Sequence, residues 1–533
     1  MIYPAVASKS ALIRKIIAAY LFEISLVLVP LYMNSGYSRL LGVKAVIYLV
    51  FAIPAVLFFL LVAAADFFIH SVSGQDRPGQ DRHMRKSAAN MRSPHANPAG
   101  TDKESAEINS SGQWFFPILL SSIGLWAAFS SLCSSDIWAS FLGTQGWYVG
   151  SLMILVLLMN TWIVCRHLEL RQWMIISVLA VNAGIFLLAI LQCAGLDPFG
   201  LLEPVFEESR ADYLSTIGNI NCFSGYLCLM VPLFCGFYIF CEDRITRLVY
   251  GGICLLGFLC VILCNSDSVY AGFGLCLFFL LPAVFERKER LGRTGELLLL
   301  FGGCLLAAWL LPVFELRRSV MRDFSALMLS PFCAGGFAAI GAVCILISRK
   351  KSSLTADSRP GFSDADMRRT LPGKTLIILQ GALGLLAMAA VIWAAVHMND
   401  EWGSGRGLIW RTGLDYFRQL PLLKKLTGTG PEMLTEALAG TVGKLPLKVI
   451  SAHSEPLQIL ISQGIIGTIG YLLFWISSIA VFIMKKMWRD GRSVFFLPLA
   501  AYLGQSLLCS AYPLTAVVFS VMAGLFWQVS YCS

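Results

Sequence analysis

Apolar positions in this chain gather in long, nearly uninterrupted stretches, and polar residues are concentrated between them. About 20 consecutive apolar residues suffice for an α-helix to cross the hydrocarbon core of a membrane. The pattern predicts an all-α polytopic membrane protein with about 14 (12–14) transmembrane helices. The predicted spans lie near 12–33, 43–66, 114–133, 149–165, 173–194, 218–241, 248–264, 268–285, 296–315, 327–348, 375–397, 456–484, 493–510 and 513–531.

Composition supports this fold class. Apolar residues make up 57% of the 533 residues and charged residues only 14%, with a mean hydropathy of +0.71. Soluble domains carry roughly 25% charged residues, so these values exclude a disordered chain and weigh strongly against a water-soluble globule. The 16 cysteines form no CxxC pair and nearly all lie in or beside apolar stretches, which indicates small core residues and neither a disulfide framework nor a metal site.

The distribution of basic residues predicts the orientation. With a cytoplasmic N-terminus and alternating spans, 28 of the 41 Lys and Arg residues fall in cytoplasmic connections and 13 in outer ones. This bias follows the positive-inside rule and favours cytoplasmic N- and C-termini. The formal charge of +9 is therefore interpreted as a topology signal, and no nucleic-acid partner is expected. Residues 1–32 resemble a basic head and a first span, with no cleavable signal peptide.

Two cytoplasmic connections, 67–113 and 349–374, are rich in small, polar and charged residues and are predicted to be flexible. The second contains Asp364-Ala365-Asp366, a D-x-D pattern that some sugar transferases use to hold a metal ion. The pattern is short and falls on the cytoplasmic side, so an ordinary solvated loop is the favoured interpretation and no metal site is predicted.

The outer connection 398–455 differs from the others in length and charge. Outer loops usually avoid basic residues, so this cluster suggests an anionic ligand. A solvated amphipathic helix at the membrane surface is an alternative, and an interfacial helix can also hold arginines over a membrane-embedded substrate. The basic residues are Arg406, Arg411, Arg418, Lys424, Lys425, Lys444 and Lys448.

His453 is the histidine that lies in an outer loop directly before a span. Histidine titrates near neutrality and can act as a general base for a sugar hydroxyl, although a lone loop histidine more often has a structural role. Arg210, in the outer connection 196–217, has Glu207 and Glu208 as neighbours, and local ion pairing is its simplest interpretation. Glu23, inside the first apolar stretch, is given no role.

Three segments together resemble the O-antigen ligase/polymerase superfamily of bacterial membrane glycosyltransferases. They are Ser215-Thr216-Ile217-Gly218-Asn219-Ile220-Asn221; Gly405-Arg406-Gly407-Leu408-Ile409-Trp410 with Pro421-Leu422-Leu423 and Gly428-Thr429-Gly430-Pro431; and Ala452-His453-Ser454-Glu455-Pro456-Leu457-Gln458 with Gln463-Gly464-Ile465-Ile466-Gly467 and Tyr471. The resemblance covers roughly residues 205–485. The chain departs from the family at Ser454, where asparagine is frequent, and over 265–270, where members often carry an arginine.

The resemblance implies three regions. Residues 1–195 would form an N-terminal transmembrane region, 196–485 the O-antigen ligase-like region with its large outer loop, and 486–533 a C-terminal helix pair.

The resemblance also implies a function. Such a protein would sit in the bacterial cytoplasmic membrane with its active site outside. It would pass a glycan from an undecaprenyl-diphosphate carrier to a hydroxyl acceptor on a glycan, a lipid or a protein, in cell-surface polysaccharide synthesis. Polysaccharide-assembly proteins would be further partners. The choice between ligase and polymerase stays open. No cofactor and no metal is expected.

The implied roles suit the residue types. His453 would take the proton of the acceptor hydroxyl, and in-line attack would invert the anomeric centre. Guanidinium groups bind phosphate oxygens bidentately, and the resemblance implies this role at the diphosphate for Arg406 and Arg210. Arg411 follows Arg406 by five residues, so a helix turns it to another face and it ranks as a helper.

Two other classes of function compete. A lipid-linked oligosaccharide flippase or other transporter would also have many spans, but it is expected to show repeated halves and charges buried within spans. A non-catalytic partner of a cell-envelope assembly would need neither His453 nor Arg406 for chemistry.

Overall fold

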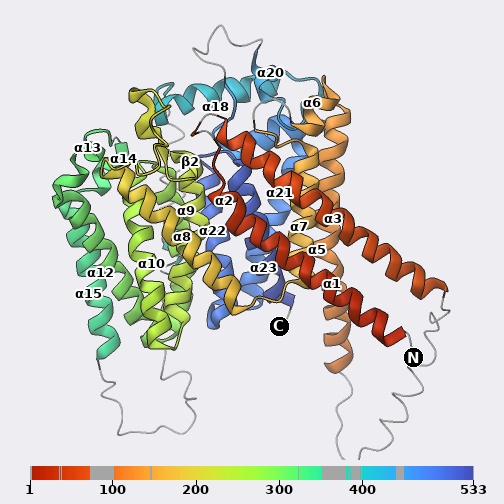
Figure 1. Cartoon of the computed structure of the whole chain (residues 1–533), viewed down its shortest axis with the longest axis horizontal. Helices are drawn as coiled ribbons and strands as arrows, with labels where there is room; N and C mark the ends of the chain where they lie inside the picture. Colours follow the sequence, from red (N-terminus) through yellow and green to blue (C-terminus); the bar gives the residue numbers. More distant parts are fainter. Residues whose placement is uncertain are drawn as a thin grey trace, which may run out of the picture.

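The computed structural model describes residues 3–34, 36–37, 39–72, 101–143, 147–321, 323–350, 378, 380–382, 384–385, 397, 399–439 and 449–531. Within these residues, ten helices are long and apolar enough to cross a membrane. The predicted all-α polytopic fold is confirmed (Figure 1).

The figure of 14 spans stays a prediction. The predicted span 375–397 lies largely outside the described residues, as do the D-x-D motif and most of the two flexible connections. The predicted span 149–165 is the 17-residue helix α7 (Ser151–His167). The predicted span 493–510 contains a 3-10 turn and the 11-residue α22 (Phe496–Ser506).

The first predicted span is one helical rod with a wider turn in it. Helix α1 (Tyr3–Glu23) continues through a π-helical turn, η1 (Ile24–Leu28), into α2 (Val29–Leu31). The last carbonyls of a helix lack partners within the helix. Here the buried Lys44 ammonium, in α3 (Leu40–Val72), donates to the carbonyl oxygens of Val29 and Pro30 at 2.9 and 2.8 Å.

The next helices extend beyond the candidate membrane spans Leu40–Ile69 and Trp114–Leu132, which border the predicted connection 67–113. Helix α3 continues to Val72, and α5 (Thr101–Leu132) begins well before the apolar stretch at 114. Residues 101–111 contain no proline or glycine, so no helix-breaking residue interrupts α5 ahead of the apolar segment. Helices α6 (Ile137–Leu142), α7 and α8 (Gln172–Cys193) follow.

The centre of the bundle is α9 (Ile220–Phe240), nearly all of whose side chains are buried. It packs against α10 (Arg244–Leu263), α11 (Ser268–Glu286), α22 and α23 (Pro513–Tyr531). A helix that is apolar on all sides is stable only when neighbours or lipid cover every face. The site described below forms at the N-terminal end of this central helix.

Helices α12 (Lys288–Leu310) and α15 (Pro331–Arg349) pack closely at one side of the bundle (Figure 1). Glycines make this approach possible, since a Cβ atom on Gly341 would lie 2.6 Å from the carbonyl oxygen of Gly295. Helix α12 starts at Lys288, so most of the basic connection predicted over 286–295 is its first two turns. The short elements η3 (Pro312–Phe314), α13 (Glu315–Ser319) and α14 (Asp323–Met328) join the pair.

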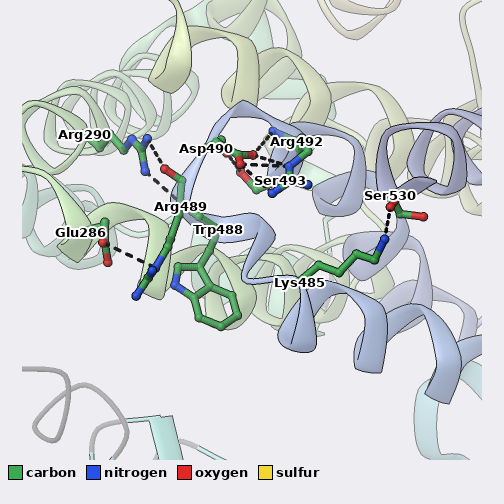
Figure 2. A network of polar contacts seen from close by, with 9 residues as sticks. All are labelled: Glu286, Arg290, Lys485, Trp488, Arg489, Asp490, Arg492, Ser493 and Ser530. Atoms are coloured by element: carbon green, nitrogen blue, oxygen red, sulfur yellow. Dashed lines mark hydrogen bonds and ion pairs between the residues drawn. The ribbon is translucent and has the colours of Figure 1, made fainter. Parts of the chain in front are cut away.

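The turn after α21 (Glu455–Met484) is held by a network of polar contacts (Figure 2). This turn comprises η5 (Met487–Arg489) and η6 (Gly491–Phe495). The Arg290 guanidinium donates to the carbonyl oxygens of Trp488 and Arg489 at 3.2 and 2.9 Å, while Lys485 donates to the carbonyl oxygen of Ser530. These contacts satisfy carbonyls that the helix ends leave open and connect α12, α21 and α23.

The segment predicted as a large outer loop contains three helices: α18 (Trp402–Gln419), α19 (Leu422–Thr427) and α20 (Leu434–Ala439). Helices α18 and α20 lie across one end of the bundle, the end that also carries α6, and the C-terminus lies toward the other end (Figure 1). We refer to the end of the bundle that carries α18, α20 and α6 as the α18 end. Trp410 and Tyr416 of α18 pack on a small buried cluster that includes Leu434 and Ile461.

The described cysteines are all free, and most are buried. This agrees with the prediction that they are small core residues.

Candidate functional site

The floor of the site is the start of α9. A short antiparallel hairpin, β1 (Tyr213–Leu214) and β2 (Gly218–Asn219), leads into this helix. Gly218 has a φ of +97°, a conformation that glycine adopts readily, and Asn219 caps the helix by accepting a hydrogen bond from the Asn221 backbone N–H at 2.9 Å. The hairpin therefore holds the Asn221 side chain at the α18 end of the central helix.

Asn221 joins four segments that are far apart in the sequence. Its Oδ1 accepts from Nη2 of Arg406 at 3.4 Å, from Oγ of Ser266 at 3.1 Å and, weakly, from Sγ of Cys509 at 3.9 Å. Ser266 lies in the stretch 265–270, where the family often has an arginine, and Ser266 also contacts Ser268 at 3.0 Å. A neutral serine pair thus occupies this position, and Arg406 is the cation that reaches Asn221.

Arg406 lies near the start of α18, where the backbone is irregular. Gly403 and Gly405 have φ values of +59° and +91°. A Cβ atom on Gly403 would lie 3.4 Å from Cδ of Arg406, so glycine at this position leaves room for the arginine side chain. The half-buried guanidinium faces Asn221 from the opposite side of the site.

His453 lies in the loop before α21, and two side chains hold that loop. The Trp410 indole N–H donates to the Ala452 carbonyl oxygen at 2.9 Å, and the Ala452 backbone N–H donates to Oε1 of Gln458 at 2.8 Å. His453 itself has a φ of +48°, which is uncommon for a residue other than glycine. Backbone strain of this kind is concentrated at functional sites.

The electrostatic environment keeps His453 neutral. Burial and, as the smaller cause, the positive charge of nearby Arg406 together lower the pKa of His453 from 6.5 to about 4. The ring nitrogen Nδ1 is buried and has no hydrogen-bond partner among the described residues. A neutral imidazole with an unoccupied nitrogen is the form that accepts a proton.

An apolar cavity of about 950 Å³ opens beside Arg406. Its walls come from α9, α10, α11, α12 and α15, with aromatic and aliphatic side chains such as Phe258, Tyr270 and Phe301. Its polar lining residues include Asp267, which directly precedes α11, and Glu401 and Arg406 at the start of α18. The cavity therefore has a mostly apolar lining that includes one cationic group, the Arg406 guanidinium.

The other two predicted arginines lie elsewhere. Arg411 forms an ion pair with Asp400 at 2.6 Å, and both side chains are about half exposed. Arg210, in the 3-10 turn η2 (Glu207–Asp212), is exposed and donates from Nε to the Val205 carbonyl oxygen at 3.2 Å. Neither lines the cavity beside Arg406.

Sequence inspection did not reveal how the glycine motifs support the site. Gly464 interrupts α21 with φ +69°, and a Cβ atom there would lie 2.3 Å from the Leu426 carbonyl oxygen. Gly428 is just as close to the Ser462 carbonyl oxygen, and the Gly430 N–H donates to that oxygen at 2.8 Å. The two motifs form one backbone contact, which explains why both are rich in glycine.

The structural role of Arg317 was not predicted, because this residue follows an apolar stretch, as an ordinary loop arginine does. It is buried and donates to the carbonyl oxygens of Leu263, Ala211 and Cys264 at 2.7, 2.6 and 3.0 Å. Its guanidinium is thus occupied in closing the end of α10 and holding the loop before β1. We see no signal in the local sequence that would have identified this role.

The fold and site define a polytopic α-helical membrane protein with an arginine–histidine pair beside an apolar cavity. The sequence profile of the O-antigen ligase family matches residues 252–472, a range that includes Arg406, Arg411 and His453 but not Arg210 or Asn221. This match confirms the predicted resemblance to the O-antigen ligase/polymerase superfamily over this region.

The match supports O-antigen ligase- or polymerase-type glycan transfer in cell-surface polysaccharide synthesis. It also supports a lipid-linked glycan as substrate and a multi-pass location in the bacterial inner membrane. No curated protein sequence matches the chain.

Proposed function

We propose that this protein transfers or polymerises a glycan from an undecaprenyl-diphosphate carrier to a hydroxyl acceptor on the outer face of the cytoplasmic membrane. The observation that carries the proposal is the position of Arg406. Its guanidinium lies at the polar end of a large apolar cavity and close enough to His453 to lower the pKa of that residue. A prenyl diphosphate has the matching shape, a long apolar chain that ends in two negative charges.

The cavity suits the prenyl chain, because its walls are formed almost entirely by apolar side chains of five helices that are candidate membrane spans. Burying apolar surface there is favourable by roughly 25 cal/mol per Å². The diphosphate would then lie at Arg406, where the guanidinium binds two phosphate oxygens at once. Arg411 and Arg210 would act at a greater distance from the diphosphate. Arg411 is already paired with Asp400, and Arg210 donates a hydrogen bond to a carbonyl oxygen of its own loop.

The proposed reaction is a single displacement. The acceptor oxygen attacks the anomeric carbon, the bond from that carbon to the diphosphate oxygen breaks, and the diphosphate leaves with the electron pair. His453 takes the acceptor proton, and Arg406 stabilises the charge that develops on the leaving group. Attack from the side opposite the diphosphate inverts the anomeric centre, and the scheme uses no metal and no cofactor.

The orientation follows from the charge distribution. The cytoplasmic assignment of the connections with most basic residues puts the α18 end outside. The loop that contains His453 and the helix that contains Arg406 would then meet the carrier on the outer leaflet.

The direct test is a transfer assay with purified protein in liposomes, supplied with the lipid-diphosphate-linked glycan of its own host. We expect longer lipid-linked glycan if the protein is a polymerase, and glycan on a different acceptor if it is a ligase. His453→Ala and Arg406→Lys should abolish transfer, because alanine cannot accept a proton and a point charge cannot replace the planar fork.

Arg418→Lys is the matched control. Arg418 lies on the same helix, pairs with Asp415 at 3.1 Å and is mostly exposed, so its variant should retain activity. Full activity of both site variants would refute the assignments. Transport of labelled lipid across the bilayer without glycan transfer would favour the transporter alternative.

A further inference from the structure

A second cavity lies beside the first turns of α21, which directly follow the His453 loop. It has a volume of about 250 Å³, and its walls come from α5, α7, α21 and α23, with segment 431–435 at the α18 end. The aromatic rings of Trp147, Tyr471 and Trp475 line it. It shares no lining residue with the cavity beside Arg406.

Three buried polar atoms on residues that line this cavity have no hydrogen-bond partner among the described residues. They are Oε2 of Glu455, Oγ of Ser510 and Nε1 of Trp475. Nearly all buried polar groups in folded proteins are hydrogen-bonded, so several unpaired groups around one cavity indicate that something polar fills it. The cavity is large enough for a ligand of several polar groups or for a few waters.

The lining identifies the chemistry of that ligand. Glu455 and Glu432 offer carboxylate oxygens, Gln458 offers both a donor and an acceptor, and the aromatic rings offer flat apolar faces. Hydroxyl groups donate to carboxylates, and the C–H faces of a sugar ring pack on aromatic rings. Two carboxylates in a partly apolar cavity disfavour an anion. Carboxylates line both cavities, but the first also has the cation Arg406 in its lining, whereas no Lys or Arg lines the second.

The second cavity is also next to the proposed general base. Glu455 is two residues after His453, and its backbone N–H donates to the Cys509 carbonyl oxygen at 3.1 Å. Cys509 in turn contacts Asn221, which binds Arg406. Glu455 lines the second cavity, and its loop is linked to Arg406 through Cys509 and Asn221 and through His453, whose pKa the charge of Arg406 lowers.

We propose that this second cavity binds the reacting end of the acceptor, a neutral sugar or an amino sugar, and that Glu455 accepts a hydrogen bond from one of its hydroxyl groups. This inference rests on the proposed function and narrows the acceptor to a glycan. A uronic acid in the same position would bind poorly, because its carboxylate would face Glu455 and Glu432.

Sugar binding can be measured without transfer. Saturation-transfer NMR on the full-length His453→Ala protein in nanodiscs would use methyl glucoside, methyl glucosaminide and methyl glucuronide as probes. We expect signals from the first two at least fivefold stronger than from the glucuronide. Glu455→Gln, added to that protein, should reduce this preference severalfold, because it removes one of the two repelling charges.

Two further variants test whether the NMR signals come from sugar bound in this cavity. Ser510→Val fills part of the cavity and should reduce the signal of all three sugars, while Glu436→Gln, an exposed glutamate of α20 outside the lining, should change none. Equal signals from glucoside and glucuronide, or no signal from any sugar, would overturn the proposal.

The transfer assay separates this inference from the proposed function. Glu455→Gln in the otherwise unmodified protein should raise the KM for the acceptor about tenfold and leave the KM for the donor unchanged. If His453→Ala abolishes transfer but Glu455→Gln leaves the acceptor KM unchanged, only the acceptor site is refuted. If the unmodified protein transfers no glycan yet binds neutral sugars, the proposed function fails and the sugar site remains.

Discussion

The lowered pKa of His453 predicts an unusual dependence of activity on pH. Burial and the charge of Arg406 lower the pKa to about 4 from 6.5. At pH 6 such a histidine is about 1% protonated, whereas a histidine with a pKa of 6.5 is about three quarters protonated. If neutral His453 is the base, the rate should stay nearly constant between pH 7.5 and pH 6. An ordinary histidine would lose about fourfold over the same range.

The assay is glycan transfer by the reconstituted protein at saturating donor and acceptor, from pH 5 to pH 8. A diphosphate with a sugar on one side and a prenyl group on the other has no further acidic proton to titrate in this range, so the donor does not obscure the result. Histidine labelled with ¹³C and compared with His453→Gln would report the pKa directly. A fourfold fall in rate with a midpoint near pH 6.5 would refute a neutral, buried base.

Three more predictions follow from contacts around the site. Gly464→Ala should lower the melting temperature, because the left-handed backbone costs about 1–3 kcal/mol and the new Cβ atom would meet the Leu426 carbonyl oxygen; an unchanged melting temperature would contradict this. Trp410→Phe should lower kcat more than it raises the donor KM, because it frees the His453 loop by removing a hydrogen bond worth about 1 kcal/mol; steady-state kinetics would show whether the effect falls on KM instead. Arg411→Gln should reduce activity far less than Arg406→Gln, since its exposed ion pair contributes at most about 1 kcal/mol; equal losses in the transfer assay would place Arg411 at the diphosphate.

The His453 and Arg406 candidates illustrate what a single sequence reveals about a site. Both stood out because a basic cluster and a histidine occupied a connection that the positive-inside rule leaves poor in cations, and because the surrounding motifs resembled a family. The structure brings these two residues close together through Asn221 and Trp410. Arg411 and Arg210 are also arginines of predicted outer connections, but side-chain direction and local partners decide whether a guanidinium faces a cavity. Neither property is visible in spacing.

The sequence alone determined that this chain is an all-α membrane protein, because long apolar stretches have few stable alternatives in a bilayer. It also located the segments that form the site, since their motifs are local. The tertiary structure decided which polar atoms meet across gaps of up to several hundred residues, such as Asn221 with Cys509. It alone formed the cavity beside Arg406 and the second one that Glu455 lines, since each has walls from helices remote in sequence. A cavity is a property of how helices pack, and packing depends on contacts that no local pattern specifies.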